Sequence, residues 1–214
     1  MNESQTLAKY QVLPGSHLKL IAVITMLIAH AAVIFSGCTN AWHQPLFQTS
    51  YSFWFLLRQV GRLAFPIFCF LLTEGYAHTK NCTKYGLNLL IFALLSEIPF
   101  NLMKGGTLLN LRHQNVYFTL LFGFLLICLW ESKLKNWQKV LVFVAAMVVL
   151  PYFRADYGRD GALLILLLYV FREQRLLRGL LSLPLLSGGL AAWCAFVPIG
   201  LYNGERGFIS GKAM

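Results

Sequence analysis

The stretch "LKLIAVITMLIAHAAVIF", from Leu18 to Phe35, is apolar almost throughout. A helix of about 20 residues crosses roughly 30 Å of hydrocarbon, so this stretch predicts a membrane-spanning helix. It nevertheless carries Lys19 at its start and His30 well inside. Polar side chains are costly within a bilayer, so an imidazole at that depth indicates either a function or a specific structural partner.

The composition extends this prediction to the whole chain. Its 214 residues are 57% hydrophobic and 12% charged, and the mean hydropathy is +0.62. These values are typical of membrane proteins, and no stretch between the apolar runs is long enough for a separate soluble domain. We therefore predict an all-α fold, a polytopic helical bundle integral to the membrane at 18–207. A cytoplasmic N-terminal segment at 1–17 precedes it, and a short tail at 208–214 follows.

The apolar runs predict about seven membrane helices. The fourth, fifth and sixth are short, so either the bilayer thins around them or their polar flanks lie at membrane depth. The seven predicted spans are 18–36, 57–78, 85–103, 115–130, 137–153, 158–171 and 179–201.

The net charge of +10 resides mainly in short loops, which indicates membrane topology and not nucleic-acid binding. If the N-terminus is inside, the inner segments hold ten Lys and Arg residues and the outer segments hold six. This excess predicts a cytoplasmic N-terminus, and an odd number of spans then predicts an outer C-terminus.

The cysteines do not follow a disulfide or metal-binding pattern. None belongs to a Cys-x-x-Cys pair and three lie in apolar runs, so we expect buried thiols and no metal site. The five are Cys38, Cys69, Cys82, Cys128 and Cys194.

Under this topology the polar residues of the spans form two layers. Members of one layer lie at similar depth, so Arg62 and Glu97 are consistent with a structural ion pair or with a catalytic role. Glu74 and His78 are four residues apart on one helix face, which also fits a solvated helix end. The inner layer comprises Lys19, Glu74, His78, Lys80 and Lys84. The outer layer comprises Arg58, Arg62, Glu97, Asn101, Gln114, Asn115, Asp156, Arg159, Asp160, Glu205 and Arg206.

Two prolines predict distortions of the spans. The ring of Pro66 crowds the carbonyl of Arg62 and predicts a bend in the second span. Pro99 has the same relationship to the Leu95 carbonyl in the third span. The freed carbonyls need other donors or water, which membrane helices obtain where they line a polar site.

Lys19 and His30 are eleven residues apart, close to three helical turns, so both point to nearly the same side. They are separated by about 16 Å along the axis, and one elongated ligand could meet both. A histidine in an apolar span is a candidate for proton transfer because its neutral form is tolerable there. The alternative is a buried imidazole hydrogen-bonded to a neighbouring helix.

Several blocks resemble, in order, the TraX family, whose namesake acetylates conjugative pilin. They are "LKLIAVITMLIAH", "RLAFPIFCFLLTEGYAHTKN", "LLIFALLSEIPFNL", "QNVYFTLL", "DYGRDGALLILLLYVFR" and "LYNGERG". The family is similar to a wider group of membrane-bound acyltransferases that use acetyl-CoA. In that group a basic residue, ten intervening residues and a histidine mark the first helix, a spacing that Lys19 and His30 match.

The resemblance implies an acetyltransferase of the bacterial inner membrane that takes acetyl-CoA from the cytoplasm and uses no metal. The acceptor would be an amine or hydroxyl, on a pilin N-terminus or on an envelope component. Together with the two layers, it suggests three groups of site residues. The catalytic group is His30, Arg62, Glu97 and Asn115; the coenzyme A group is Lys19, His78, Lys80 and Lys84; the acceptor group is Asp156, Tyr157, Asn203, Glu205 and Arg206.

The sequence departs from the family pattern in two places. Family members usually have an aspartate directly before the histidine, where this chain has Ala29. The family also continues past "NGERG" into a final helix with another histidine. Two other functions therefore stay open: an inactive family member with a binding role, and a small transporter or channel, although no internal repeat of the kind common in transporters is present.

Overall fold

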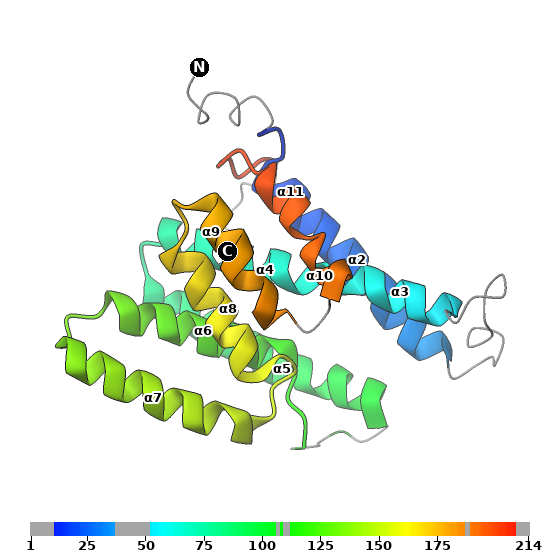
Figure 1. Ribbon diagram of the computed structural model, residues 1–214. Helices are drawn as coiled ribbons and strands as arrows, with labels where there is room; N and C mark the ends of the chain where they lie inside the picture. Colours follow the sequence, from blue (N-terminus) through cyan, green and yellow to red (C-terminus); the bar gives the residue numbers. More distant parts are fainter. Residues whose placement is uncertain (1–10, 37–51, 106–107, 109–111, 187–188, 209–214) are drawn as a thin grey trace. The chain divides into compact units, whose positions relative to one another are not determined.

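A computed structural model describes residues 11–36, 52–105, 108, 112–186 and 189–208 (Figure 1). These residues are helical apart from turns and two isolated bridges, so the predicted all-α class is confirmed. The elements are α2 (Gly15–Ser36), α3 (Phe53–Gly61), α4 (Ala64–His78), α5 (Cys82–Gly105), α6 (Val116–Glu131), α7 (Asn136–Phe153), α8 (Gly158–Val170), α9 (Arg175–Ser182), η2 (Leu183–Leu185), α10 (Gly189–Trp193) and α11 (Phe196–Gly200).

Four stretches of the described chain are long and apolar enough to cross a membrane. They correspond to the first, second, third and fifth predicted spans, and they expose many large apolar side chains, as lipid-facing helices do. The fourth and sixth predicted spans form α6, of 16 residues, and α8, of 13 residues. The four stretches are Gly15–Phe35, Phe53–His78, Cys82–Met103 and Asn136–Phe153.

The second span is interrupted at Arg62 and Leu63, between α3 and α4. Their backbone N–H groups donate to the carbonyls of Gln59 (3.1 Å) and Val60 (3.2 Å), which closes α3 with a tight turn. Pro66 then lies in the first turn of α4, where a missing N–H removes no helical bond. The helix is therefore interrupted close to the position where Pro66 predicted a bend, whereas α5 continues through Pro99.

The predicted seventh span, 179–201, is wrong as a single helix. The chain forms α9, the short 3₁₀ turn η2, and then α10 and α11 over this range. Pro184 lies in η2, and Gly189 at the start of α10 has a φ of +60°. A proline and a left-handed glycine each interrupt the hydrogen-bonding pattern that one continuous helix needs.

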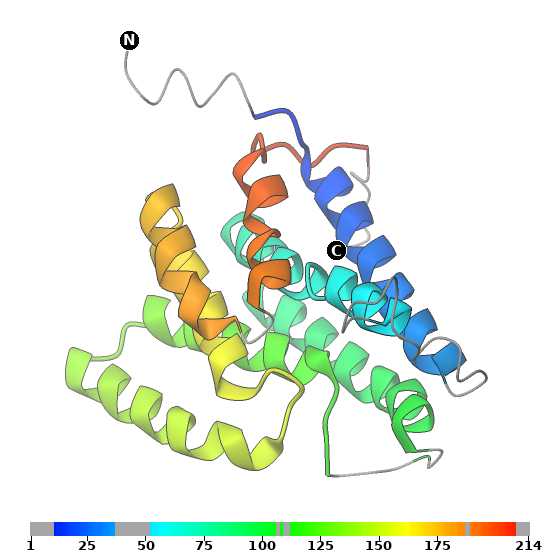
Figure 2. The ribbon, with the colours of Figure 1, turned by 45° about the vertical axis from the view of Figure 1, so that its right-hand side comes forward.

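The chain divides into two compact units, each with its own packing. Unit 1 is Met1–Leu71 with Ser187–Met214, and unit 2 is Leu72–Leu186. In unit 1, α2 lies along α3 (Figures 1 and 2). In unit 2, α6 packs against both α5 and α8, and α7 contacts α6 and α8. Leu126, Leu150 and Ala162 form the apolar core where α6, α7 and α8 meet.

Glycine permits a close helix contact in each unit. A Cβ at Gly61 of α3 would overlap the Cβ of Ala29 on α2. In unit 2, a Cβ at Gly123 of α6 would lie 2.7 Å from Ile165 Cβ on α8. Small residues allow membrane helices to approach this closely, so that dispersion contacts accumulate along the interface.

Candidate functional site

The α2 helix runs without a break from Gly15 to Ser36, so Lys19 and His30 lie three turns apart on one flank. Lys19 is half-buried and His30 is exposed. The flank beside it, which includes Ala22, Ala29 and Ala32, is buried and made of small and branched apolar residues. Lys19 and His30 therefore share one flank of α2, and a ligand path along this flank stays a prediction.

The imidazole of His30 has a defined proton arrangement. Its Nδ1 lies 2.8 Å from the backbone carbonyl of Met26, one turn earlier in the same helix. A carbonyl only accepts, so Nδ1 carries the proton of the neutral ring and Nε2 presents a lone pair. His30 is exposed and bonds to its own helix, which contradicts the alternative of a buried imidazole held by a neighbouring helix.

Ala29 does not occupy a position from which a side chain would orient His30. It is only 8% exposed and packs against Gly61 of α3. In this chain the Met26 carbonyl orients the His30 ring. Sequence reasoning missed this bond, although a carbonyl four residues earlier is available to any histidine in a helix.

The N-terminal end of α2 is joined to the chain around "YNGERG". Four backbone hydrogen bonds link residues 13–16 to residues 201–206, so the first donors of α2 are satisfied by loop carbonyls. The bonds are Leu13 N to Leu201 O (2.9 Å), Asn203 N to Leu13 O (3.0 Å), Gly15 N to Glu205 O (2.7 Å) and Ser16 N to Arg206 O (2.9 Å).

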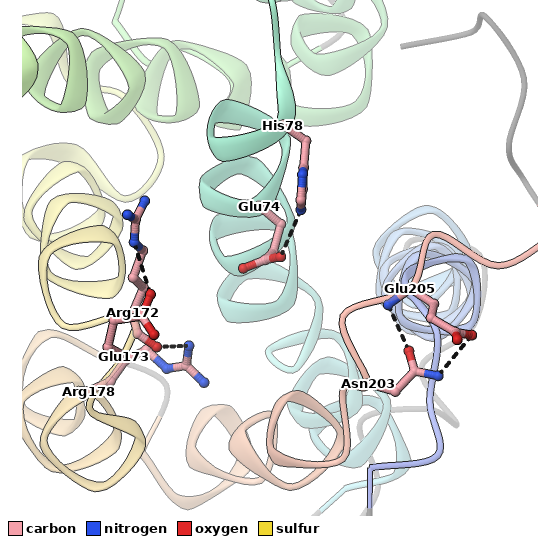
Figure 3. Close-up of polar contacts among 7 residues, drawn as sticks. All are labelled: Glu74, His78, Arg172, Glu173, Arg178, Asn203 and Glu205. Atoms are coloured by element: carbon pink, nitrogen blue, oxygen red, sulfur yellow. Dashed lines mark hydrogen bonds and ion pairs between the residues drawn. The ribbon is translucent and has the colours of Figure 1, made fainter. Parts of the chain in front are cut away.

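These bonds correct the prediction of the membrane side on which this loop lies. An odd number of crossings placed Glu205 and Arg206 on the side of the membrane opposite Lys19. The structure places them at the same end of α2 as Lys19, because 179–201 is not one crossing helix. Asn203 and Glu205 bond to each other there, with Asn203 Nδ2 donating to Glu205 Oε2 at 3.3 Å (Figure 3).

In unit 2, Glu97 and Asn115 form a buried polar pair between α5 and α6. The Asn115 side-chain amide donates to Glu97 Oε2 and to the Ala93 carbonyl (2.7 Å). Its Oδ1 accepts from Tyr117 N at 2.9 Å, so Asn115 is the N-cap of α6. Asn115 is 2% exposed and Asn101, one turn after Glu97, is 3% exposed. Within the described residues, Glu97 Oε1 and Asn101 Nδ2 are buried without a hydrogen-bond partner.

Other members of the predicted outer layer gather at the same end of unit 2. Tyr157 N donates to the buried hydroxyl of Thr119 (3.4 Å), and Gln114 N donates to the Arg154 carbonyl (3.2 Å). These bonds bring the residues before α8, Asp156 among them, next to the start of α6. Arg62 belongs to unit 1 and Glu97 to unit 2, so an ion pair between them stays a prediction.

The predicted inner layer of unit 2 is more open. Glu74 Oε2 lies 3.8 Å from His78 Nε2 at the end of α4, where the imidazole is exposed (Figure 3). Lys80 and Lys84 are exposed, and the backbone N–H of Lys84 is capped by Asn81 (2.8 Å). This arrangement fits a solvated helix end, and coenzyme A contacts of His78, Lys80 and Lys84 stay predictions.

Three contacts at this end of unit 2 escaped sequence reasoning. Tyr169 donates its hydroxyl to Glu131 Oε1 (3.0 Å), and the Arg172 guanidinium lies over the Tyr169 ring, 5.1 Å from its centroid. Arg178, only 7% exposed, donates to the Arg172 carbonyl (3.4 Å; Figure 3). The sequence signal that could have revealed the Tyr169 contact is a tyrosine inside the sixth apolar run, because a buried phenol hydroxyl needs a hydrogen-bond partner.

No group of three potential metal ligands occurs among the residues that the structure describes. The described cysteines are free thiols, and Cys38 lies outside the described residues. These free thiols are Cys69, Cys82, Cys128 and Cys194.

Comparison with known proteins places the chain in a family. It is 30% identical over 165 residues to the probable fimbrial assembly protein FimC, serogroup H1, of Dichelobacter nodosus. That match covers 74% of this chain and 62% of the relative, so the chain spans less than two thirds of the relative's length. No solved structure matches the chain. The model of the TraX protein family matches residues 14–202, and the chain therefore belongs to the TraX family.

Proposed function

We propose that this membrane protein is an acetyltransferase that moves an acetyl group from acetyl-CoA to an amine or hydroxyl acceptor. Family membership and the fimbrial assembly name of a relative favour an acceptor on a pilin or on another envelope component. The observation that carries the proposal is the exposed imidazole of His30. Its Nδ1 proton is directed to Met26, so Nε2 is available as a base three turns from Lys19.

In the proposed reaction, the acceptor nitrogen or oxygen attacks the thioester carbon. The new bond to the acceptor forms, the carbon–sulfur bond breaks, and the acceptor proton passes to Nε2 of His30. The imidazolium then returns this proton to the departing thiolate, which leaves as free coenzyme A. The Met26 carbonyl stabilises the imidazolium because it already accepts from Nδ1.

The charge that develops on the thioester oxygen needs a donor. Both N–H groups of the Asn115 amide are already used by Glu97 and Ala93, so Asn115 serves as a positioning residue in this proposal. The guanidinium of Arg62 is exposed, is permanently charged and belongs to the same unit as His30, and it donates to Gln59 Oε1 (3.1 Å). We assign the oxyanion to Arg62.

Within unit 2, Glu97 has a buried carboxylate oxygen without a partner among the described residues, and Asp156 and Tyr157 lie by the start of α8. A role of these residues in acceptor binding stays a prediction. The cytoplasmic membrane of a bacterium, with the start of α2 on the cytoplasmic side, is the proposed location. Coenzyme A then reaches Lys19 directly from the cytoplasm.

The test uses the full chain in lipid nanodiscs, acetyl-CoA labelled in the acetyl group, and two acceptors: a peptide with a free α-amine and a bacterial envelope fraction. His30→Gln should lower transfer by about 10²- to 10⁴-fold, the usual contribution of a general base. His113→Gln removes an exposed histidine from unit 2 and should leave the rate unchanged. Undiminished transfer by His30→Gln would exclude the proposed base.

The two other functions give different results in the same preparation. A transporter would show solute flux in reconstituted vesicles without acetyl-CoA. An inactive binding protein would show no labelled product with either acceptor although the chain is folded. Either result would overturn the acetyltransferase proposal.

A further inference from the structure

The joined ends of unit 1 bring two cationic side chains together. Ser16 N bonds to the Arg206 carbonyl, and Lys19 follows Ser16 by three residues, one helical turn. Lys19 is half-buried, and its charge interacts with that of Arg206. The sequence had assigned these two cations to different ligands on opposite sides of the membrane.

This pair of like charges has no carboxylate counterpart in the described part of the chain. Neither Lys19 nor Arg206 belongs to an ion pair of the described residues, and the nearby carboxylate of Glu205 bonds to the Asn203 amide. Like charges that are held together raise the free energy unless an anion lies between them. The arrangement therefore fits a ligand that supplies the missing negative charge.

A buried hydroxyl adds a third polar group. Ser16 is 1% exposed, and its Oγ has no hydrogen-bond partner among the described residues. It lies against Gly207, where a Cβ would overlap it, directly after Arg206 in sequence. The backbone donors of Gly15 and Ser16 are occupied by loop carbonyls, so a ligand would be held by side chains and not by the helix N-terminus.

We propose that Lys19, Arg206 and the Ser16 hydroxyl bind a phosphate-ester group. Arginine presents a planar set of donors that matches phosphate oxygens, and lysine supplies a compact positive charge. The phosphate can come from coenzyme A, in which case the proposal rests on the acetyltransferase function, or from an anionic lipid headgroup. Arg206 thereby moves from the acceptor group of residues to the donor group.

The experiment measures binding and does not depend on acetyl transfer. The full chain in phosphatidylcholine nanodiscs is titrated with adenosine 3′,5′-bisphosphate, which carries phosphates but no thioester, and with adenosine as the uncharged probe. A second arm uses nanodiscs with increasing phosphatidylglycerol and records the thermal midpoint of unfolding. The variants are Lys19→Gln, Arg206→Gln and Arg206→Lys, with Arg159→Gln as a control that removes an exposed arginine of unit 2.

We expect the bisphosphate to bind and adenosine not to bind. Loss of one charge-assisted contact corresponds to a reduction in affinity of about tenfold to a hundredfold. Lys19→Gln and Arg206→Gln should each show this reduction in affinity. Arg206→Lys should recover part of the affinity, and Arg159→Gln should bind like the wild type. If only phosphatidylglycerol stabilises the wild type, and the two glutamine variants lose this effect, the phosphate site stands with lipid as its source.

Two results would overturn the site: a wild-type chain that responds to neither phosphate source, or glutamine variants that respond like the wild type. A loss of binding counts only for variants whose elution volume and helical circular dichroism match the wild type. His30→Gln should bind the bisphosphate normally. Bisphosphate binding without any acetyl transfer by the wild type would refute the proposed function while leaving the site intact.

Discussion

The side-chain amide of Asn115 donates to Glu97 Oε2 at 2.5 Å, and this bond joins the start of α6 to the middle of α5. The backbone N–H of Asn115 donates to the same oxygen at 3.2 Å. One carboxylate oxygen therefore accepts twice from one residue, and that residue also caps α6. The pair combines the roles of helix cap and interhelical contact, so its loss affects two elements together.

Asn115→Ala should therefore destabilise the protein more than the loss of a simple cap. Removing a cap costs about 0.5–2 kcal/mol, and leaving a buried acceptor without its donor costs about 1–3 kcal/mol. Chemical unfolding in mixed micelles measures the change. Asn136→Ala, at the exposed start of α7, should stay within about 0.5 kcal/mol of the wild type. If the two substitutions changed the free energy of unfolding equally, Asn115 would not have the combined role of helix cap and interhelical contact.

Alanine substitutions at Gly123 and Gly179 should have opposite effects on stability, because Gly123 lies at the contact of α6 with α8 and Gly179 lies in open space. A Cβ at Gly123 would lie 2.7 Å from Ile165 Cβ and 2.9 Å from its Cγ2, so Gly123→Ala forces the helices apart. Overpacking of this kind costs about 1–3 kcal/mol. At Gly179 of α9 nothing lies within 4 Å of a new Cβ, and alanine should stabilise the helix by up to about 1 kcal/mol. Thermal unfolding of both variants in one detergent gives the comparison.

Restoring the family's usual aspartate should not improve this protein. Ala29 is buried against Gly61, so the carboxylate of Ala29→Asp would enter the interface of α2 and α3 away from solvent. An unpaired buried charge costs several kcal/mol. If the carboxylate takes up a proton instead, the protonation costs free energy of similar size. We expect a lower unfolding midpoint and no increase in acetyl transfer. Ala77→Asp, at an exposed position of α4, is the matched control and should unfold close to the wild type. A more active, equally stable Ala29→Asp protein would show that the aspartate does reach His30.

The hydrogen bonds between residues 13–16 and 201–206 predict that both segments face one compartment. In a background without the five native cysteines, His17→Cys and Asn203→Cys should react from the same side with a membrane-impermeant maleimide. With the proposed orientation this side is the cytoplasm, so both should be protected in intact cells and labelled in inverted vesicles. Asp160→Cys, in the predicted outer layer, should show the reverse pattern. Labelling of positions 17 and 203 from opposite sides would contradict the paired ends.

Local sequence signals predicted much of this fold. The four long apolar stretches follow from hydropathy, and the interruption at Arg62 follows from the position of Pro66. The failure at 179–201 arose because an apolar run long enough to span does not show how Pro184 and Gly189 divide it.

The candidate site was less predictable for a physical reason. Helical spacing shows that Lys19 and His30 share a flank, but α2 is apolar on nearly every side, so the pattern does not reveal which flank is covered. The proximity of Arg206 to Lys19 depends on hydrogen bonds between residues nearly the whole chain apart. Counting spans gave the wrong relation between them, because one miscounted crossing reverses the side of every later residue.

The joined ends of unit 1 also bear on synthesis. α2 leaves the ribosome well before the carbonyls of Glu205 and Arg206, which accept from Gly15 and Ser16. At the usual 5–20 residues per second, translation takes roughly 10 to 40 s to reach them. During that interval the nascent helix has open backbone donors at its end. A chain released shortly before position 201 would contain the four long apolar stretches of the described residues, but the start of α2 would lack its loop acceptors.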